Sequence, residues 1–285
     1  MNPTLRKALT AAFLVVSIFL AYKLWYGIDS VVATRELIAT QEQQMIDRLR
    51  LIREAEIVFQ EQNGRYTANW DSLANFIENG KVPIISRREE IKLKAYGGED
   101  VILHIDTIGF ISAKDRIFKK NYTMNAPEDG TFVGFNAKVT EGAEVIKGMD
   151  AYEMTSSDTA KASAGRRISP KFIENGTIAK LAKVVAGDKV SKGTTLINFW
   201  EYQFDINTDV RKIGEIPYLT EADGKPVMLQ IFVGKVNKNG LLVDAIEVVD
   251  PRPVNPDRKE SNDMKTRKPL RFGSRFDAST GGNWE

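Results

Sequence analysis

The sequence predicts an α+β protein: an N-terminal transmembrane helix continues into a long amphipathic helix, and two similar small β-rich units follow. Three observations favour this fold class. Residues 8–28 are almost entirely apolar, residues 29–62 contain neither glycine nor proline, and two later segments share one β-like pattern. With 285 residues the chain is longer than one domain usually is, so we expect more than one folded part.

The composition excludes several classes of site. Hydrophobic residues make up 42% and charged residues 27% of the chain, and the net charge of +2 offers no field for nucleic acid. There is no cysteine, which excludes disulfides, thiolate metal sites and a cysteine nucleophile. His104 is the only histidine, so a two-histidine zinc motif is excluded as well. We therefore predict no cofactor and no metal.

The apolar run predicts a membrane anchor over residues 8–28. Its 21 residues would span about 31 Å as a helix, close to the thickness of the hydrocarbon core. Lys23 is its only charged residue and lies near the aromatic end. The residues that mark the two ends of the anchor are Ala8, Trp25, Tyr26 and Ile28.

The flanking charges predict the topology. Basic residues within 1–7 place this short N-terminus in the cytoplasm by the positive-inside rule, and the bulk of the chain in the periplasm. The predicted location is therefore the inner membrane, crossed once. A cleaved signal peptide is the alternative, although the residues after the apolar run lack a small-x-small cleavage pattern.

Residues 29–63 are predicted to form an amphipathic stalk helix, because helix-favouring residues dominate them. Apolar residues recur every seven positions along it, and Asn63-Gly64 is a typical helix end. Two interpretations remain open. The stripe packs on the protein's own domain, or it is the seam of a coiled coil with itself or a partner helix. The candidate seam residues are Val31, Ile38, Met45, Ile52 and Phe59.

A short second helix is predicted before Asn79-Gly80, because Trp70, Leu73, Phe76 and Ile77 are spaced as on one helical face. The stretch LRLIREAEIVFQEQNGRYTANWDSLANFI, residues 49–77, is similar to the helix, Asn-Gly-x-Tyr turn and short helix of bacterial pseudopilins and minor pilins. Where pilins carry their cleavage site, this chain has Arg6-Lys7-Ala8-Leu9. The resemblance implies a membrane helix running into the stalk, in an envelope protein of Gram-negative type.

An internal repeat is predicted from segments 129–154 and 223–248. They align without a gap at an offset of 94 and share seven identical positions, among them Val133/Val227 and Val139/Val233. Both segments read as strands with Asp-Gly and Asn-Gly turns. The predicted organisation is a first β-rich unit at 64–155, a linker at 156–169 and a second unit at 170–250.

The search for chemistry leaves two weak candidates. His104 and Asp106 would share one face of a strand, as a base and its orienting carboxylate do, but a surface histidine gives the same pattern. The repeat also carries two carboxylate pairs, Asp150 with Glu153 and Asp244 with Glu247, which could bind a hard cation or lie on a solvated face. No phosphate-binding glycine motif occurs.

The C-terminal tail, 251–285, contains four prolines and a net charge of +3, typical of a solvated disordered segment. Its aromatic and arginine residues favour a second interpretation, in which it docks on a partner or on the body. The candidate docking residues are Leu270, Arg271, Phe272, Arg275, Phe276 and Trp284.

These features predict a non-enzymatic, single-pass structural or assembly component of a bacterial envelope machine, such as a secretion, pilus-like or motility apparatus. Its predicted partners are the lipid bilayer and other envelope proteins, or a second copy of the chain bound through the stalk, and not nucleic acid. The alternative is a membrane-tethered enzyme or ligand sensor that uses His104 and Asp106 or the repeated carboxylates.

Overall fold

The computed structural model describes residues 3–93, 99–157, 165–255 and 269–285, and strands account for 39% of the residues. The chain divides into two compact units. Unit 1 contains residues 1–56, 65–70 and 212–285, and unit 2 contains residues 57–64 and 71–211. This division does not follow the predicted boundary at the 156–169 linker, whose described part contributes strand β7 to unit 2.

Two helices come first along the described chain, and strands interrupted by two short helical segments follow. In chain order they are α1 (Pro3–Asn63), α2 (Trp70–Asn79), β1 (Lys81–Leu93), β2 (Glu99–Ser112), α3 (Ala113–Phe118), β3 (Lys119–Asn125), β4 (Gly130–Phe135), β5 (Glu144–Val145), β6 (Tyr152–Ser156), β7 (Arg167–Ile168), β8 (Gly176–Leu181), β9 (Lys189–Val190), β10 (Thr195–Tyr202), η1 (Val210–Lys212), β11 (Glu215–Thr220), β12 (Pro226–Met228), β13 (Gln230–Lys238), β14 (Leu241–Val249) and β15 (Arg271–Gly273).

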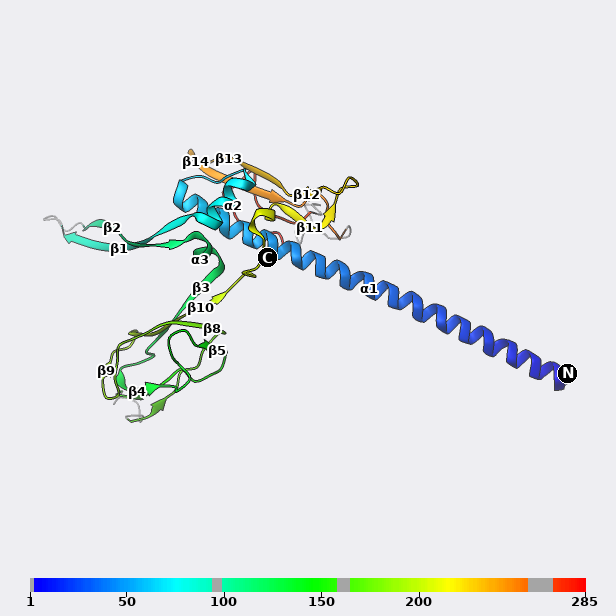
Figure 1. Ribbon diagram of the computed structural model, residues 1–285, viewed down its shortest axis with the longest axis horizontal. Helices are drawn as coiled ribbons and strands as arrows, with labels where there is room; N and C mark the ends of the chain where they lie inside the picture. Colours follow the sequence, from blue (N-terminus) through cyan, green and yellow to red (C-terminus); the bar gives the residue numbers. More distant parts are fainter. Residues whose placement is uncertain (1–2, 94–98, 158–164, 256–268) are drawn as a thin grey trace. The chain divides into compact units, whose positions relative to one another are not determined.

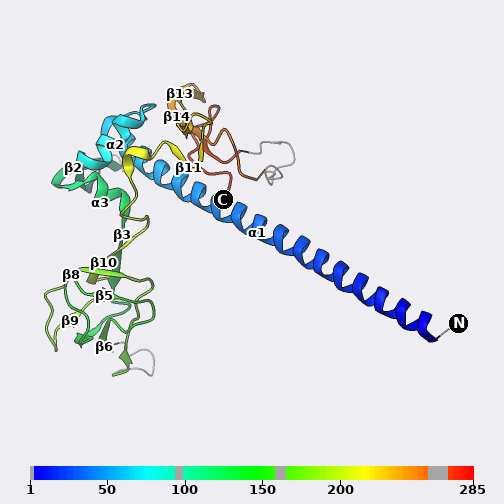
Figure 2. The ribbon, with the colours of Figure 1, turned by 45° about the vertical axis from the view of Figure 1, so that its right-hand side comes forward.

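Helix α1 is one uninterrupted helix of 61 residues (Figures 1 and 2). It ends at Asn63, and Gly64 then adopts a φ of +72°, the left-handed conformation that glycine tolerates best. Helix α2 ends at Asn79, directly before Gly80. Both predicted helix ends are therefore confirmed.

The predicted membrane anchor is contradicted. Within the part of the chain whose residues are described, no helix has a stretch long and apolar enough to cross a bilayer. The predictions of a transmembrane helix over 8–28, of an inner-membrane location and of a cytoplasmic N-terminus are therefore wrong. Of the predicted anchor residues, Trp25 is exposed, and the side chains of Ala8, Tyr26 and Ile28 lie outside those described.

The coiled-coil prediction for the stalk is also wrong. Met45 and Ile52 are fully buried within the single chain, and Ile38 is half-buried, so these side chains are not available as a seam for a partner helix. Phe59 is half-buried and packs edge-on against Phe76 of α2, with ring centroids 5.1 Å apart. Val31, at the other end of the stripe, is exposed.

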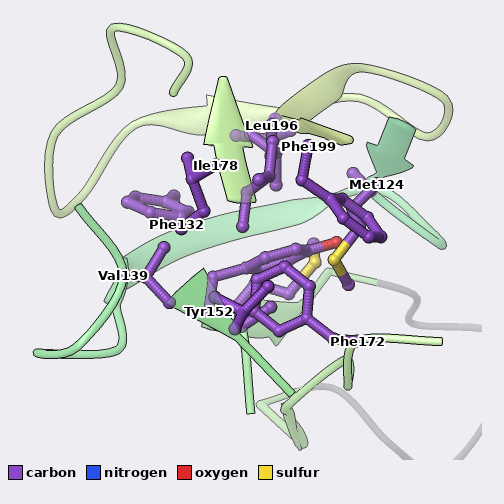
Figure 3. Packing of buried hydrophobic residues seen from close by; sticks show 14 residues of the cluster. Met124, Phe132, Val139, Tyr152, Phe172, Ile178, Leu196 and Phe199 are labelled. Carbon is purple, nitrogen blue, oxygen red and sulfur yellow. The ribbon is translucent and has the colours of Figure 1, made fainter. Parts of the chain in front are cut away.

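Unit 2 contains a sandwich of two four-stranded sheets, in the orders β3-β10-β8-β5 and β7-β6-β4-β9. Fourteen buried residues form its core, and Figure 3 shows the rings of Phe132, Tyr152, Phe172 and Phe199 gathered there. Phe172 meets Phe199 edge-on at 5.2 Å between centroids. Tyr152 satisfies its buried hydroxyl by donating to the carbonyl oxygen of Asn125 at 2.9 Å.

The sandwich is built from a repeat that is shorter than the predicted one. Residues 139–148 and 184–193 both read Val-x-x-Gly-x-x-Val-x-Lys-Gly, at an offset of 45. The first copy of the repeat contains β5, which pairs with β8 in the sheet that also contains β10. The second copy contains β9, which pairs with β4 in the sheet that also contains β6. Each half of the sandwich therefore contributes one short strand to the sheet of the other half. Equivalent bonds join the halves: Gly187 N–H donates to Phe132 O and Gly142 N–H to Ile178 O, both at 2.9 Å.

The predicted duplication of 129–154 in 223–248 is therefore wrong. Val133 is 38% exposed whereas its proposed equivalent Val227 is 4% exposed. The first segment supplies strands to both sheets of the sandwich, while most of the second is the hairpin β13–β14. The two segments share turn chemistry and strand alternation, and these recur in unrelated β-structures.

Unit 1 contains the three-stranded sheet β13-β14-β15 and the pair β11–β12. Asn239 and Gly240 join β13 to β14 with φ values of +52° and +87°, so the predicted Asn-Gly hairpin is confirmed. Asp250 follows β14 and is fully buried. Its carboxylate accepts from Arg252 N–H at 2.8 Å and from the Tyr218 hydroxyl at 3.2 Å, and burial raises the pKa of this carboxyl.

Candidate interaction surface

Strands β1 and β2 form a long antiparallel ribbon (Figure 1), and among the described residues neither pairs with a third strand. β-Branched residues, which favour strands, are frequent in both, but apolar and polar residues do not strictly alternate, since residues 87–90 are all charged and 101–103 all apolar. The register pairs Arg87 with Ile105, Arg88 with His104 and Glu89 with Leu103. Because side chains of paired residues point to the same side, the register defines the two faces.

One side of the ribbon, which we call the ribbon face, is mainly apolar. Its five apolar side chains are each between 46% and 59% exposed, and they lie on consecutive odd-numbered rungs together with Thr107 and two charged residues, Arg87 and Glu89. The apolar members of the ribbon face are Ile85, Ile91, Val101, Leu103 and Ile105. A contiguous apolar face of this kind is the usual mark of an interaction site.

The other side, the polar face, carries the candidate pair His104 and Asp106. His104 and Asp106 do share this face, as predicted, but the His104 ring contacts Glu90 instead, with Nε2 3.0 Å from Oε2. Both of these side chains are 48% exposed on an open strand. The polar face therefore holds a solvated imidazole–carboxylate contact and no enclosed catalytic arrangement at His104.

The four repeated carboxylates each face a basic side chain. Asp150 lies 3.9 Å from Lys171 and Glu153 lies 3.1 Å from Arg167. Asp244 and Glu247 are paired in the same way, with Lys235 and Arg275 respectively. Over the described ranges, no three residues of the types His, Cys, Asp and Glu are grouped closely enough to hold a metal ion.

The described part of the tail folds onto unit 1. Strand β15 pairs with β14, and Leu270 and Phe272 are buried at 2% and 0% exposure. Arg275 Nε lies 2.5 Å from the buried Glu247 carboxylate, while Phe276 remains 78% exposed. Arg271, which also lies near Glu247, is half-buried at the start of β15.

The chain end is held by α1. Arg53 donates from Nη1 to the side-chain carboxylate of Glu285 at 2.5 Å and lies over the Trp284 ring, 5.9 Å from its centroid. This hydrogen bond lowers the pKa of the Glu285 side chain. The tail is expected from the sequence to dock either on a partner or on the body of the protein, and these contacts are with the body.

Glu56 is a buried titratable residue, away from the ribbon in the sequence, that sequence reasoning missed. It lies on α1 at 1% exposure, and its Oε2 accepts from Thr67 N–H at 3.0 Å. Burial raises the pKa of this carboxyl to about 8, against the lowering effect of the Thr67 hydrogen bond. A glutamate in a stretch rich in Glu, Gln and Arg reads as a surface residue, so nothing local marks it as buried.

The sequence matches no protein-family model and no curated protein.

Proposed function

We propose that this protein is a structural or assembly component that works by binding other protein chains, and that it binds them through the ribbon face of β1–β2. The observation that carries the proposal is the exposure of this face: five aliphatic side chains lie together on one side of a two-stranded ribbon. A two-stranded hairpin is at best marginally stable alone in water, so a partner that covers one face would also stabilise the ribbon.

The size of the hydrophobic term supports binding. Burial of a Val, Leu or Ile side chain contributes about 1.5–3 kcal/mol when the change runs from full exposure to full burial. The five side chains of the ribbon face keep roughly half of their surface accessible, so a partner could still recover about half of that term from each. The resemblance of residues 49–77 to pseudopilins, which assemble into larger structures, points in the same direction.

An enzyme or ligand sensor built on His104 is less favoured. The imidazole lies on an open strand face beside Glu90, where water competes for every hydrogen bond it could offer a substrate. The repeated carboxylates are each ion-paired, which leaves them as poor starting points for acid–base work.

The test is the native mass of the protein in extracts of cells that produce it naturally. We expect a defined assembly heavier than the 31.9 kDa chain, and loss of that assembly when Leu103→Glu places a carboxylate on the ribbon face. Arg88→Glu, one rung away on the polar face, is the matched control and should leave the mass unchanged. Wild-type protein running as a single chain, or equal masses for all three proteins, would refute the proposal.

A further inference from the structure

The charged residues of the ribbon face are arranged in a self-complementary way. Arg87 and Glu89 lie two residues apart on β1, on either side of the rung formed by Arg88 and His104. Apolar side chains lie beyond them in both directions, Ile85 on one side and Ile91 on the other. The face thus has one positive and one negative group, at equal distances from one central rung.

A twofold axis at that rung matches the ribbon face with itself. If two ribbons stack face to face and the axis runs across the strands at the Arg88–His104 rung, residues at equal distances before and after the rung lie opposite each other. Arg87 then faces Glu89 of the second copy, and Glu89 faces its Arg87. Ile85 faces Ile91 in the same way, and on β2 Leu103 faces Ile105.

We propose that the partner of the ribbon face is a second copy of this chain, stacked antiparallel about this axis. This deepens the proposed function, on which it rests, by naming the partner. Arg87 on Glu89 is then a cation on an anion, Ile85 on Ile91 and Leu103 on Ile105 are apolar pairs, and Thr107, opposite Ile85 in the register, faces Val101. A face without this symmetry, for instance one with two arginines, would oppose like charges and would disfavour a twofold dimer.

The area of the ribbon sets the expected strength. From Ile85 to Ile91 the face is seven residues long, about 24 Å at 3.4 Å per residue, and two strands are about 10 Å wide. The resulting footprint of roughly 240 Å² per copy is well below the ~800 Å² that each partner contributes to a standard-size interface. We therefore expect a weak and reversible dimer, with a dissociation constant on the order of micromolar or weaker.

Charge exchange on the ribbon face tests the proposal. The full chain is purified in a mild detergent that keeps the exposed apolar side chains of α1 in solution, and its mass is followed against concentration by sedimentation. Arg87→Glu and Glu89→Arg, each alone, place like charges opposite each other and should weaken dimerisation about tenfold or more. A one-to-one mixture of the two variants brings opposite charges together again and should restore the dimer. The double exchange within one chain should restore it too.

The control is Arg88→Glu, which makes the same charge change on the polar face and should dimerise as the wild type does. The inference is overturned if the purified chain stays single at every concentration, if the mixture is no better than its components, or if Arg88→Glu weakens the dimer as much as Arg87→Glu. Should a heavier assembly still depend on Leu103 in cell extracts, the proposed function survives and the partner is a different protein.

Discussion

At the scale of single residues, Glu56 shows how burial changes the role of a side chain that looks ordinary in the sequence. One of its oxygens accepts from Thr67 N–H, and the other, Oε1, is buried without a hydrogen-bond partner among the described residues. A buried carboxylate in that position favours its neutral form, because the charged form loses its hydration. The folded protein therefore holds a proton on Glu56 that the unfolded chain releases at lower pH.

This raised pKa predicts how stability depends on pH. Between the ordinary value of 4.5 and the folded value of about 8, the folded state binds more protons than the unfolded state, so stability falls as the pH rises through that window. Glu56→Gln keeps the shape without the charge and should stabilise the protein at pH 8 by a few kcal/mol, since each pKa unit corresponds to about 1.4 kcal/mol. Denaturant unfolding at pH 5 and pH 8 measures the effect.

The control for this prediction is Glu36→Gln, which changes an exposed glutamate of the same helix and should alter stability at neither pH. If the difference in unfolding free energy between Glu56→Gln and the wild type is the same at pH 5 and at pH 8, the carboxylate is already charged in the folded protein at pH 5. The assignment of a raised pKa would then be wrong.

At the scale of elements, the sequence predicted local structure well and pairing poorly. The ends of α1 and α2 and the Asn239-Gly240 hairpin follow from turn chemistry within a few residues, and all three are present. The pairing partners of β5 and β9 cannot be predicted from turn chemistry in this way. Each is two residues long and joins the sheet of the opposite half, so no pattern within the strand reveals where it pairs. The signal that could have found the sandwich was the Val-x-x-Gly-x-x-Val-x-Lys-Gly repeat.

The equivalence of the two halves of the sandwich predicts equal effects at two glycines. A Cβ on Gly130 would lie 2.3 Å from the carbonyl oxygen of Thr155, and one on Gly176 would lie 2.5 Å from that of Trp200. Neither backbone oxygen can move without disturbing a strand, so Gly130→Ala and Gly176→Ala should each destabilise unit 2 by about 1–3 kcal/mol. Thermal or denaturant unfolding measures the loss.

Gly134 provides the control within the same strand, β4. A Cβ there meets no atom within 4 Å, so Gly134→Ala should change stability by no more than about 0.5 kcal/mol. If only one of the first two substitutions is destabilising, the two halves are not equivalent in the way the hydrogen bonds indicate.

At the scale of the whole molecule, the sequence missed what brings distant segments together. Unit 1 combines residues 1–56 with residues 212–285, and the described part of the tail, 269–285, supplies a strand to its sheet. The tail looked disordered because it has few apolar residues, yet Leu270 and Phe272 are enough to bury it against β14. The ribbon face cannot be predicted from either strand alone, since the separation of its faces depends on the register with which β1 pairs with β2.

The most direct test of the central claim compares two neighbouring positions on opposite faces of the ribbon. Because the chain has no cysteine, Leu103→Cys and His104→Cys each create a single thiol, the first on the ribbon face and the second on the polar face. The measurement is the rate at which a maleimide labels each thiol in the assembled and in the dissociated protein. The account predicts that assembly slows labelling at position 103 several-fold and leaves the rate at position 104 unchanged. Equal rates at position 103 in both states, or equal protection at the two positions, would contradict it.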